Sequence, residues 1–396
     1  MSRVFLLIRG LALLGVVASV GTPSVAGPRS TTSLQPVYRF HAAHAVSFRC
    51  AFDSRTLHFC PSRYSVQLAP GKHTLRVRAV GKRGSSRVVA VKVSVTVPYP
   101  ALTAAAPVQV GKGAGVPAVD GSDVWVPVTS TGALARVGAT GAVVGTTKVG
   151  VASASGAGFL DSATAAGGSV WSASDAGGTI TRIEPATGAI IATIAAGTRP
   201  GGLVVGDGAV WAFGFLGDAV TRIDVGTGLA RTLHVSGAVA TGIAYGGGSL
   251  WLLTTNPSRI LEVDPSSGAV RRTIALQPPF ARTASIIETW WLAYGDGAVW
   301  ATLPNYGAVA RLETATGSVV YARTPYGRPF GVAAGDGSAW VATDHGVDRL
   351  DGVTGKPTGV ALLPTADASG FVSIAYAGGA AWFANYDRGT LTRVSG

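Results

Sequence analysis

One pattern of apolar and polar positions recurs between residues 107 and 396. A glycine-containing turn is followed by an apolar residue and a tryptophan in every copy, at Trp125, Trp171, Trp211, Trp251, Trp300, Trp340 and Trp382. Successive tryptophans are 40 to 49 residues apart. A repeat of this length indicates an architecture built from one recurring supersecondary unit.

Each unit of the repeat is expected to form four short strands. In the third unit, apolar runs at 202–205, 210–213, 219–223 and 230–235 are separated by turns. The turns contain Asp-Gly or Gly-Gly pairs, and these residues tolerate the positive φ angles that tight hairpins need. Four-stranded units of 40 to 49 residues predict a β-propeller, and no stretch shows helical periodicity of useful length.

The two ends of the repeat predict how the ring closes. The last unit stops after its third strand at 390–394, and the first unit is preceded by a lone apolar run, 107–110. Gly111 lies 14 residues before Trp125, the same distance as Gly197 before Trp211. We therefore expect residues 107–110 to be the fourth strand of the last blade, closing a seven-bladed propeller over 107–396 and leaving no free sheet edge.

The segment 36–98 has a different pattern. Residues 73–80 and 91–97 alternate apolar with polar or basic side chains, as expected for a half-buried antiparallel sheet. Residues 27–100 contain 12 Lys/Arg and one acid, Asp53, which gives +11, while the chain beyond residue 100 sums to −1. Either a polyanionic partner or a solvated basic surface explains this asymmetry.

The first 26 residues read as a secretory signal peptide. Arg3 precedes an apolar run at 11–20, and Ser24-Val25-Ala26 is a small-x-small cleavage pattern. The run is shorter than the ~20 residues that cross a bilayer, and we expect no transmembrane segment in the mature chain. We expect a secreted, extracytoplasmic monomer in which Cys50 and Cys60 can form a disulfide.

Composition narrows the classes further. Hydrophobic residues make up 47% of the chain, which excludes a disordered protein. Two cysteines exclude a disulfide-dense scaffold and a cysteine-based zinc site. His41, His44, His58 and His73 lack the spacing of a metal site, and no metal or cofactor is expected.

Two stretches resemble known families. The run from Phe48 through Cys50 and Cys60 to Leu75 resembles bacterial immunoglobulin-like modules of secreted proteins, in which two cysteines close a hairpin and a Gly-x-His-Thr-Leu turn opens the next strand. This resemblance implies a small immunoglobulin-like β-sandwich domain over 36–98. Such a domain could be a truncated sandwich or a stalk.

The repeat resembles secreted propellers of the YVTN and streptogramin lyase (virginiamycin B lyase) superfamily. The resemblance covers 107–396 and is carried by the Gly-x-[Val/Leu]-Trp elements and by Arg-[Ile/Leu]-[Asp/Glu]-x-x-Thr-Gly, as at 182–188. It implies the fold, but that fold hosts enzymes, binding proteins and uncharacterised surface proteins alike.

Alignment of the units on their tryptophans places candidate site residues. Loops between blades and loops between second and third strands meet on one face of a propeller, which we call the mouth. There we expect a site for a small ligand or a protein partner, formed mainly by blades five to seven, with these residues: Arg199, Glu288, Trp290, Trp291, Tyr306, Arg328, Phe330, Asp344, Tyr386 and Arg388.

A structural role competes with this interpretation. An insertion around 277–287 precedes Trp290 and Trp291, and both rings could fill the gap that it leaves. Glu288 would then pair with Arg328. The seven repeat tryptophans are expected to pack between blades, because they recur at the same place in every unit.

An enzymatic function has less support. Streptogramin lyases use a Glu-x-His element with magnesium, whereas neither His234 nor His345 has Glu two residues earlier. The one catalytic candidate is His345, beside Asp344 or Glu288.

Our main hypothesis is a non-catalytic binding propeller with a basic module that attaches to an anionic cell-envelope polymer; a lyase or hydrolase is the alternative. Nucleic acid is not expected, because of export and because we expect no interleaved exposed aromatic residues in the basic segment.

Overall fold

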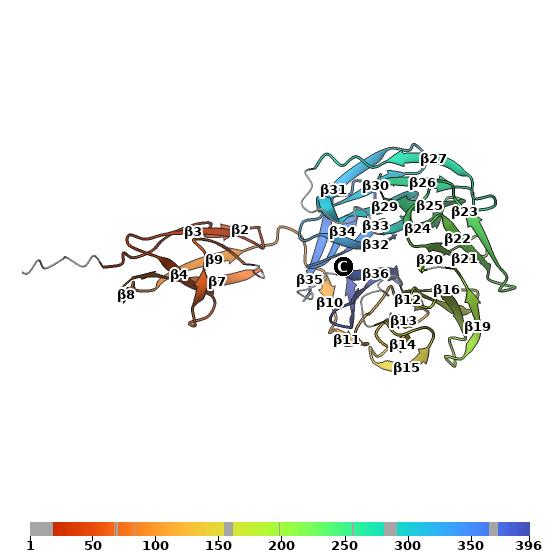
Figure 1. The fold of residues 1–396 in the computed structure, drawn as a ribbon, viewed down its shortest axis with the longest axis horizontal. Coiled ribbons are helices and arrows are strands. Elements are labelled where there is room, and N and C mark those ends of the chain that lie inside the picture. Colours follow the sequence, from red (N-terminus) through yellow and green to blue (C-terminus); the bar gives the residue numbers. More distant parts are fainter. Residues whose placement is uncertain are drawn as a thin grey trace, which may run out of the picture. The chain divides into compact units, whose positions relative to one another are not determined.

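The computed structural model describes residues 19–396 except 67, 69, 83, 154–160, 198, 256, 281–290 and 364–370. These residues are almost entirely in β-strands and turns (Figure 1). The chain divides into two compact units, Met1–Pro98 and Tyr99–Gly396. The fold is therefore all-β, as the sequence predicts.

The first unit is a β-sandwich of two sheets. One sheet has the order β1 (Ser24–Ala26), β3 (Val37–His41), β6 (Arg63–Ser65). The other has the order β2 (Ser30–Thr31), β9 (Val89–Val95), β7 (Gly71–Gly81), β4 (Ser47–Phe52), β5 (His58–Cys60), with β8 (Gly84–Ser85) paired to β7.

Aromatic rings join the two sheets. Tyr38 and Phe40 of β3 contact Phe52 and Phe48 of β4, with ring centroids 5.7 and 5.6 Å apart. On β7, every second residue from Leu75 to Ala79 is buried, and the residues between them are more exposed. The predicted alternation thus separates a core face from a polar face.

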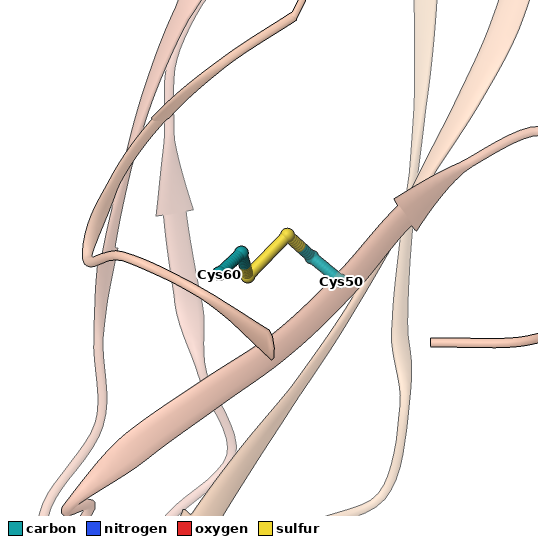
Figure 2. Close-up of a disulfide and its surroundings, with 2 residues drawn as sticks. All are labelled: Cys50 and Cys60. Atoms are coloured by element: carbon teal, nitrogen blue, oxygen red, sulfur yellow. A yellow bond between two sulfur atoms is a disulfide. The ribbon is translucent and has the colours of Figure 1, made fainter. Parts of the chain in front are cut away.

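The sandwich begins earlier than residue 36. Strands β1 and β2 belong to it, and Ser24–Ala26, the expected end of the signal peptide, pairs with β3. Cleavage after Ala26 would therefore remove β1. The predicted disulfide joins Cys50 of β4 to Cys60 of β5, with 5.9 Å between the Cα atoms (Figure 2).

The second unit is a propeller whose described residues form seven sheets. Each sheet is antiparallel, and chain order equals strand order in the first six. Blades one to three comprise β12 (Ala118–Asp120), β13 (Asp123–Val128), β14 (Ala133–Val137), β15 (Val143–Lys148); β16 (Ser162–Ala166), β17 (Ser169–Ser174), β18 (Thr179–Ile183), β19 (Ile190–Ala195); β20 (Pro200–Gly206), β21 (Ala209–Gly214), β22 (Ala219–Asp224), β23 (Ala230–His234).

Blades four to six repeat this arrangement. They comprise β24 (Ala240–Gly246), β25 (Ser249–Thr254), β26 (Arg259–Val263), β27 (Val270–Ala275); β28 (Leu292–Gly295), β29 (Ala298–Leu303), the 3₁₀ turn η1 (Pro304–Tyr306), β30 (Ala308–Glu313), β31 (Val319–Arg323); β32 (Pro329–Gly335), β33 (Ser338–Thr343), β34 (Gly346–Asp351), β35 (Pro357–Leu362). Figure 1 shows the blades following one another around a ring.

The seventh blade combines both ends of the propeller. It comprises β36 (Val372–Ala377), β37 (Ala380–Asn385), β38 (Thr390–Ser395), β10 (Thr103–Ala104) and β11 (Val108–Gln109). Val108 pairs with Leu391, the pairing that ring closure by 107–110 requires. β10 also pairs with β38, an addition that the sequence pattern did not indicate. The fourth strand is therefore split, with residues 105–107 between its halves.

The repeat tryptophans form the cores between blades. In blades one to five each is at most 1% exposed. In six blades an arginine guanidinium lies over the ring, 5.1 to 5.9 Å from its centroid. Nε1 of Trp211 donates to the carbonyl of Gly206 at 3.0 Å. The predicted packing role is confirmed.

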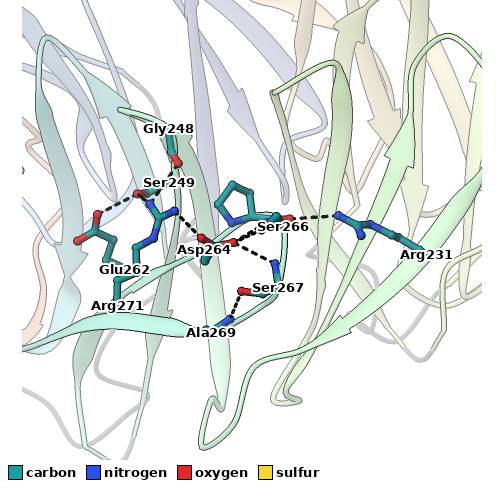
Figure 3. A network of polar contacts seen from close by, with 10 residues as sticks. Arg231, Gly248, Ser249, Glu262, Asp264, Ser266, Ser267, Ala269 and Arg271 are labelled. Carbon is teal, nitrogen blue, oxygen red and sulfur yellow. Dashed lines mark hydrogen bonds and ion pairs between the residues drawn. The ribbon is translucent and has the colours of Figure 1, made fainter.

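Turns on the face opposite the mouth tie neighbouring blades together. In blade four, Oδ1 of Asp264 accepts the N–H groups of Ser266 and Ser267, and Oδ2 accepts from Arg271 at 2.5 Å (Figure 3). Hydrogen bonds from Ser266 and then Arg271 lower the pKa of Asp264. Arg231 of blade three donates to the carbonyl of Pro265 at 3.4 Å, so the ordered turn is also a contact between blades.

Candidate functional site

Arg199 is fixed at the mouth by a buried carboxylate. Its Nε and Nη2 donate to Oδ1 and Oδ2 of Asp175 at 2.9 and 3.1 Å. The Asp175 side chain is fully buried, while that of Arg199 is 38% exposed. The guanidinium also lies over Phe215, 4.8 Å from the ring centroid. Arg199 has a φ of 52°, an uncommon conformation for a non-glycine residue and one often found at functional sites.

A second carboxylate, Asp161, lies beneath this pair. Its Oδ1 accepts the N–H of Asp175 at 2.8 Å, and its Oδ2 accepts the hydroxyl of Thr129 at 3.3 Å. Burial raises the pKa of Asp161 to about 6, and the negative charge of Asp175 acts in the same direction. Sequence alignment missed Asp161, although it stands ten residues before Trp171, as Phe330 does before Trp340.

Replacing Asp161 with asparagine should stabilise the protein at about pH 8, by roughly 1–3 kcal/mol, because the fold opposes ionisation of this carboxyl group. An amide can keep both hydrogen bonds. The pKa of Asp161 is higher in the folded protein than in the unfolded chain. The wild-type protein therefore becomes more stable as the pH falls through about 6, towards the pKa of the unfolded chain, and the variant should not show this increase. Denaturant unfolding at several pH values measures both effects.

Asp218→Asn provides the control, because Asp218 is exposed and the substitution makes the same change in charge. It should change the free energy of unfolding by no more than about 0.5 kcal/mol. Equal stabilisation by the two substitutions would show that net charge, and not burial of Asp161, is responsible.

A second arginine–aspartate group lies on blade six. The backbone N–H and Nε of Arg328 donate to Oδ1 and Oδ2 of Asp344 at 2.7 and 2.9 Å. Nδ1 of His345 lies 2.8 Å from Oδ1 of the same carboxylate. Burial raises the pKa of Asp344, but hydrogen bonds with His345 and Arg328 outweigh it and the pKa is lowered overall. The Arg328 guanidinium lies 5.4 Å from the ring centroid of Phe330.

Aromatic side chains occupy the centre of the mouth. Trp291, Phe330 and Tyr386 surround a cavity of about 20 Å³ together with Phe371. Trp291 also borders a cavity of about 70 Å³ inside the channel. Ligand pockets usually enclose roughly 300–1,000 Å³, so these cavities are too small for a typical organic ligand. Trp291 packs against the core between blades five and six and lines both cavities.

The other predicted site residues do not join this centre. Tyr306 follows β29 in η1 and packs against the blade four and five core beside Tyr321. Arg388 is exposed in the turn between β37 and β38. Glu288 and Trp290 lie outside the described residues, so the expected Glu288–Arg328 pair is not described.

The described part of the mouth offers little for a metal ion. Among the described residues, no group of three or more His, Cys, Asp or Glu side chains lies close enough to hold one. The described residues therefore do not fit the magnesium that the lyase resemblance implies. A separate finding concerns membranes: within the described ranges, no helix has the length and apolar character needed to span a bilayer.

The sandwich carries its positive charge in opposed pairs. Arg49 of β4 lies directly opposite Arg78 of β7, and Arg39 of β3 lies opposite Arg63 of β6. All four arginines are exposed. Like charges facing each other across strands destabilise a sheet, so this arrangement has a cost that an anionic partner would relieve.

An exposed aromatic ring accompanies the arginines, contrary to the sequence expectation. Phe59 is 76% exposed and lies opposite Arg49 in register. Asp53, the one acid of residues 27–100, is bonded to Nδ1 of His73 at 2.6 Å. The outer face thus combines cations with a ring.

Comparisons with known proteins support the fold. No protein-family model matches the chain, and no curated protein matches it. The β-propeller domain of Myceliophteria thermophila Cps50 (Swd1) is 12% identical with a TM-score of 0.58, and the match covers 73% of this chain and 98% of that chain. Kuenenia stuttgartiensis hydrazine synthase is 17% identical with a TM-score of 0.57, covering 76% and 97%. A chain of the mitotic checkpoint complex is 13% identical with a TM-score of 0.56, covering 71% and 86%. At these identities the similarity shows a β-propeller fold and nothing more specific.

Proposed function

We propose that this protein is an exported, non-catalytic binding propeller that docks a partner protein on its mouth. The observation that carries this proposal is the pair of anchored arginines, Arg199 and Arg328, around the small cavities that Trp291 lines. Each guanidinium is held by an aspartate and covers a phenylalanine ring. Arginine and aromatic side chains held rigidly at a surface are typical of interface hot spots.

The described part of the mouth favours a protein over a small molecule. The central cavities are small, whereas the anchored arginines are partly exposed, at 38% and 41% of their side chains. Leu216 follows Phe215, the residue over which Arg199 lies, in the loop after β21, and it is 47% exposed. A broad surface with exposed cationic and apolar groups suits a protein partner.

A crosslinking experiment tests the docking face. A photoreactive amino acid at Leu216 should capture a partner in the producing cell, because that position lies at the mouth. The same amino acid at Leu229 or Val353, both 73% exposed in turns on the opposite face, should not capture it. Mass spectrometry of the crosslinked bands identifies the partner. Capture from the opposite face but not from the mouth would contradict the proposal.

We further propose that the sandwich attaches the protein to an anionic polymer of the cell envelope. The opposed pairs Arg49–Arg78 and Arg39–Arg63 support this, since their mutual repulsion would fall when an anion lies between them. Phe59 could add a stacking contact, and nucleic acid remains the less favoured polyanion because the proposed location is outside the cytoplasm.

The double substitution Arg49→Gln and Arg78→Gln should release the protein from cells at lower salt, because two contacts with the polymer are lost. Lys148→Gln with Lys356→Gln removes the same charge from the propeller and should leave retention unchanged. Washing cells in rising salt concentration and measuring the released protein compares the variants. Retention that ignores salt in every variant would refute electrostatic attachment.

A lyase or hydrolase remains the alternative, centred on His345. The contact between His345 and Asp344 orients the imidazole as a general base would require. However, Asp344 also binds Arg328, and the described cavities at the centre of the mouth hold little space for a substrate. The geometry favours the binding function.

A further inference from the structure

The seventh blade meets the first blade in a contact that differs from the other contacts between blades. A groove of about 790 Å³ opens there, on the face opposite the mouth. It is bordered by Trp382 and Arg393 of blade seven, by Val119 and the turn 138–141 of blade one, and by residues 105–109. We call it the seam groove.

Two other contacts between blades show what the seam groove lacks. Tyr245 stacks on Trp211 with centroids 6.3 Å apart and 14° between planes, and Tyr376 stacks on Trp340 at 5.6 Å and 17°. Each tyrosine stands six residues before the tryptophan of its own blade. Val119 has this position in blade one. Trp382 is only partly buried, whereas the six other repeat tryptophans are 3% exposed or less.

A shortened turn widens the gap further. Ala165, Val205 and Ala334 also replace tyrosine, yet the tryptophans that precede their blades are buried. At two of these contacts, the turn between the third and fourth strands of the next blade reaches the arginine of the preceding blade. A backbone carbonyl of that turn accepts a hydrogen bond from the arginine, as the carbonyl of Gly352 does from Arg311 at 2.6 Å. In blade one, this turn is closed by a hydrogen bond from the N–H of Gly138 to the carbonyl of Ala142. It is one residue shorter than the turn of blade two, which is closed by a hydrogen bond from the N–H of Glu184 to the carbonyl of Ala189, and it contains no acidic residue.

The arginine at the seam is also exceptional. In register with their tryptophans, Arg136, Arg182, Arg222, Arg311 and Arg349 lie over the rings at 5.1 to 5.9 Å and are at least half-buried. Arg393 faces Trp382 in the same register but is exposed. In the part of the chain that the structure describes, its guanidinium has no hydrogen bond or ion pair. The seam groove therefore combines a partly exposed indole ring with a cation.

We propose that the seam groove binds a tyrosine side chain of a partner protein, presented on an extended segment with carboxylates beside it. The ring takes the place that Tyr245 and Tyr376 fill elsewhere in the propeller and stacks on Trp382. A neighbouring carboxylate pairs with Arg393, the exposed cation at the edge of the groove. Residues 105–107, which interrupt the fourth strand, line the groove, and the segment would lie along them.

The peptide N-acetyl-Glu-Tyr-Glu-amide tests this site on the full chain. Saturation-transfer NMR should show contact of its ring protons with the wild-type protein, whereas the matching peptide with valine in place of tyrosine should bind at least about tenfold more weakly. Val119→Tyr supplies the missing ring from within and should abolish peptide binding. Arg393→Ala should weaken binding by about fivefold, because it removes only the ion pair.

Val205→Tyr is the matched control. It makes the same substitution at the same repeat position against Trp171, which is already buried, and it should leave peptide binding unchanged. Cooperative unfolding of each variant shows that it is folded. Undetectable binding to wild type at about 5 mM peptide, or unchanged binding by Val119→Tyr, would overturn the proposal, since millimolar affinity is the weakest that one stacked ring and one ion pair should give.

Discussion

Replacing Trp211 with alanine should lower the free energy of unfolding by about 3–5 kcal/mol, the usual cost of removing a buried tryptophan. The ring is fully buried, stacks on Tyr245, lies under Arg222 and donates to the carbonyl of Gly206. Its removal would leave a cavity between two blades and take away the ring over which Arg222 lies. Denaturant unfolding followed by circular dichroism measures the loss.

Trp382→Ala makes the same substitution at the seam and should cost only about 1–2 kcal/mol, because less apolar area leaves contact with the protein. The ring is partly exposed and its neighbour from blade one is Val119. Equal losses at Trp211 and Trp382 would mean that the seam is as tightly packed as the other contacts, and the seam groove would then be closed in solution.

The repeat could be predicted because its determinants are local. Each tryptophan follows a turn that any four-residue window reveals, and each strand has its own apolar pattern. Propeller sheets contact mainly their neighbours, so local patterns suffice to specify the blades. The split of the fourth strand into β10 and β11 could not be read in this way, because two-residue strands carry almost no pattern.

The mouth could be predicted only in part. Alignment on the tryptophans brought out Arg199, Arg328 and Asp344, because loop positions follow from the repeat. It missed Asp161, whose hydrogen bonds come from two blades, from the hydroxyl of Thr129 and the backbone N–H of Asp175. It also placed Tyr306 at the mouth, whereas η1 directs this side chain towards the core of blades four and five.

The seam groove shows why departures from a repeat need the closed ring to be interpreted. Val119, the short turn at 138–141 and the partly exposed Trp382 are separate details along the chain. Only pairing of β11 with β38 brings them together. Six of the seven contacts then act as references for the one that differs.

Replacing Val108-Gln109-Val110 with Gly-Ser-Gly should destabilise the propeller by about 3–5 kcal/mol. Two half-buried valines are lost from the core between blades seven and one, and glycine adds an entropic cost of roughly 1 kcal/mol at each position. Since β11 joins the start of the propeller to its end, its loss should also loosen the ring and expose the start of β38, Thr390 and Leu391, as a free edge, while β10 still pairs with Val394 and Ser395. Unfolding in denaturant and limited proteolysis measure the two effects.

The same replacement at Ile190-Ile191-Ala192 separates closure from the general cost of glycine in a strand. These residues lie on the outer strand β19, where Ile190 and Ile191 are 48% and 50% exposed, and the blade stays joined to its neighbours by the chain. We expect a loss of about 2 kcal/mol or less and no new cleavage near residue 390. If both replacements gave the same loss and the same proteolytic pattern, the pairing of β11 with β38 would contribute nothing beyond an ordinary outer strand. The ring would then be held closed by β10 and by the packing of blades seven and one.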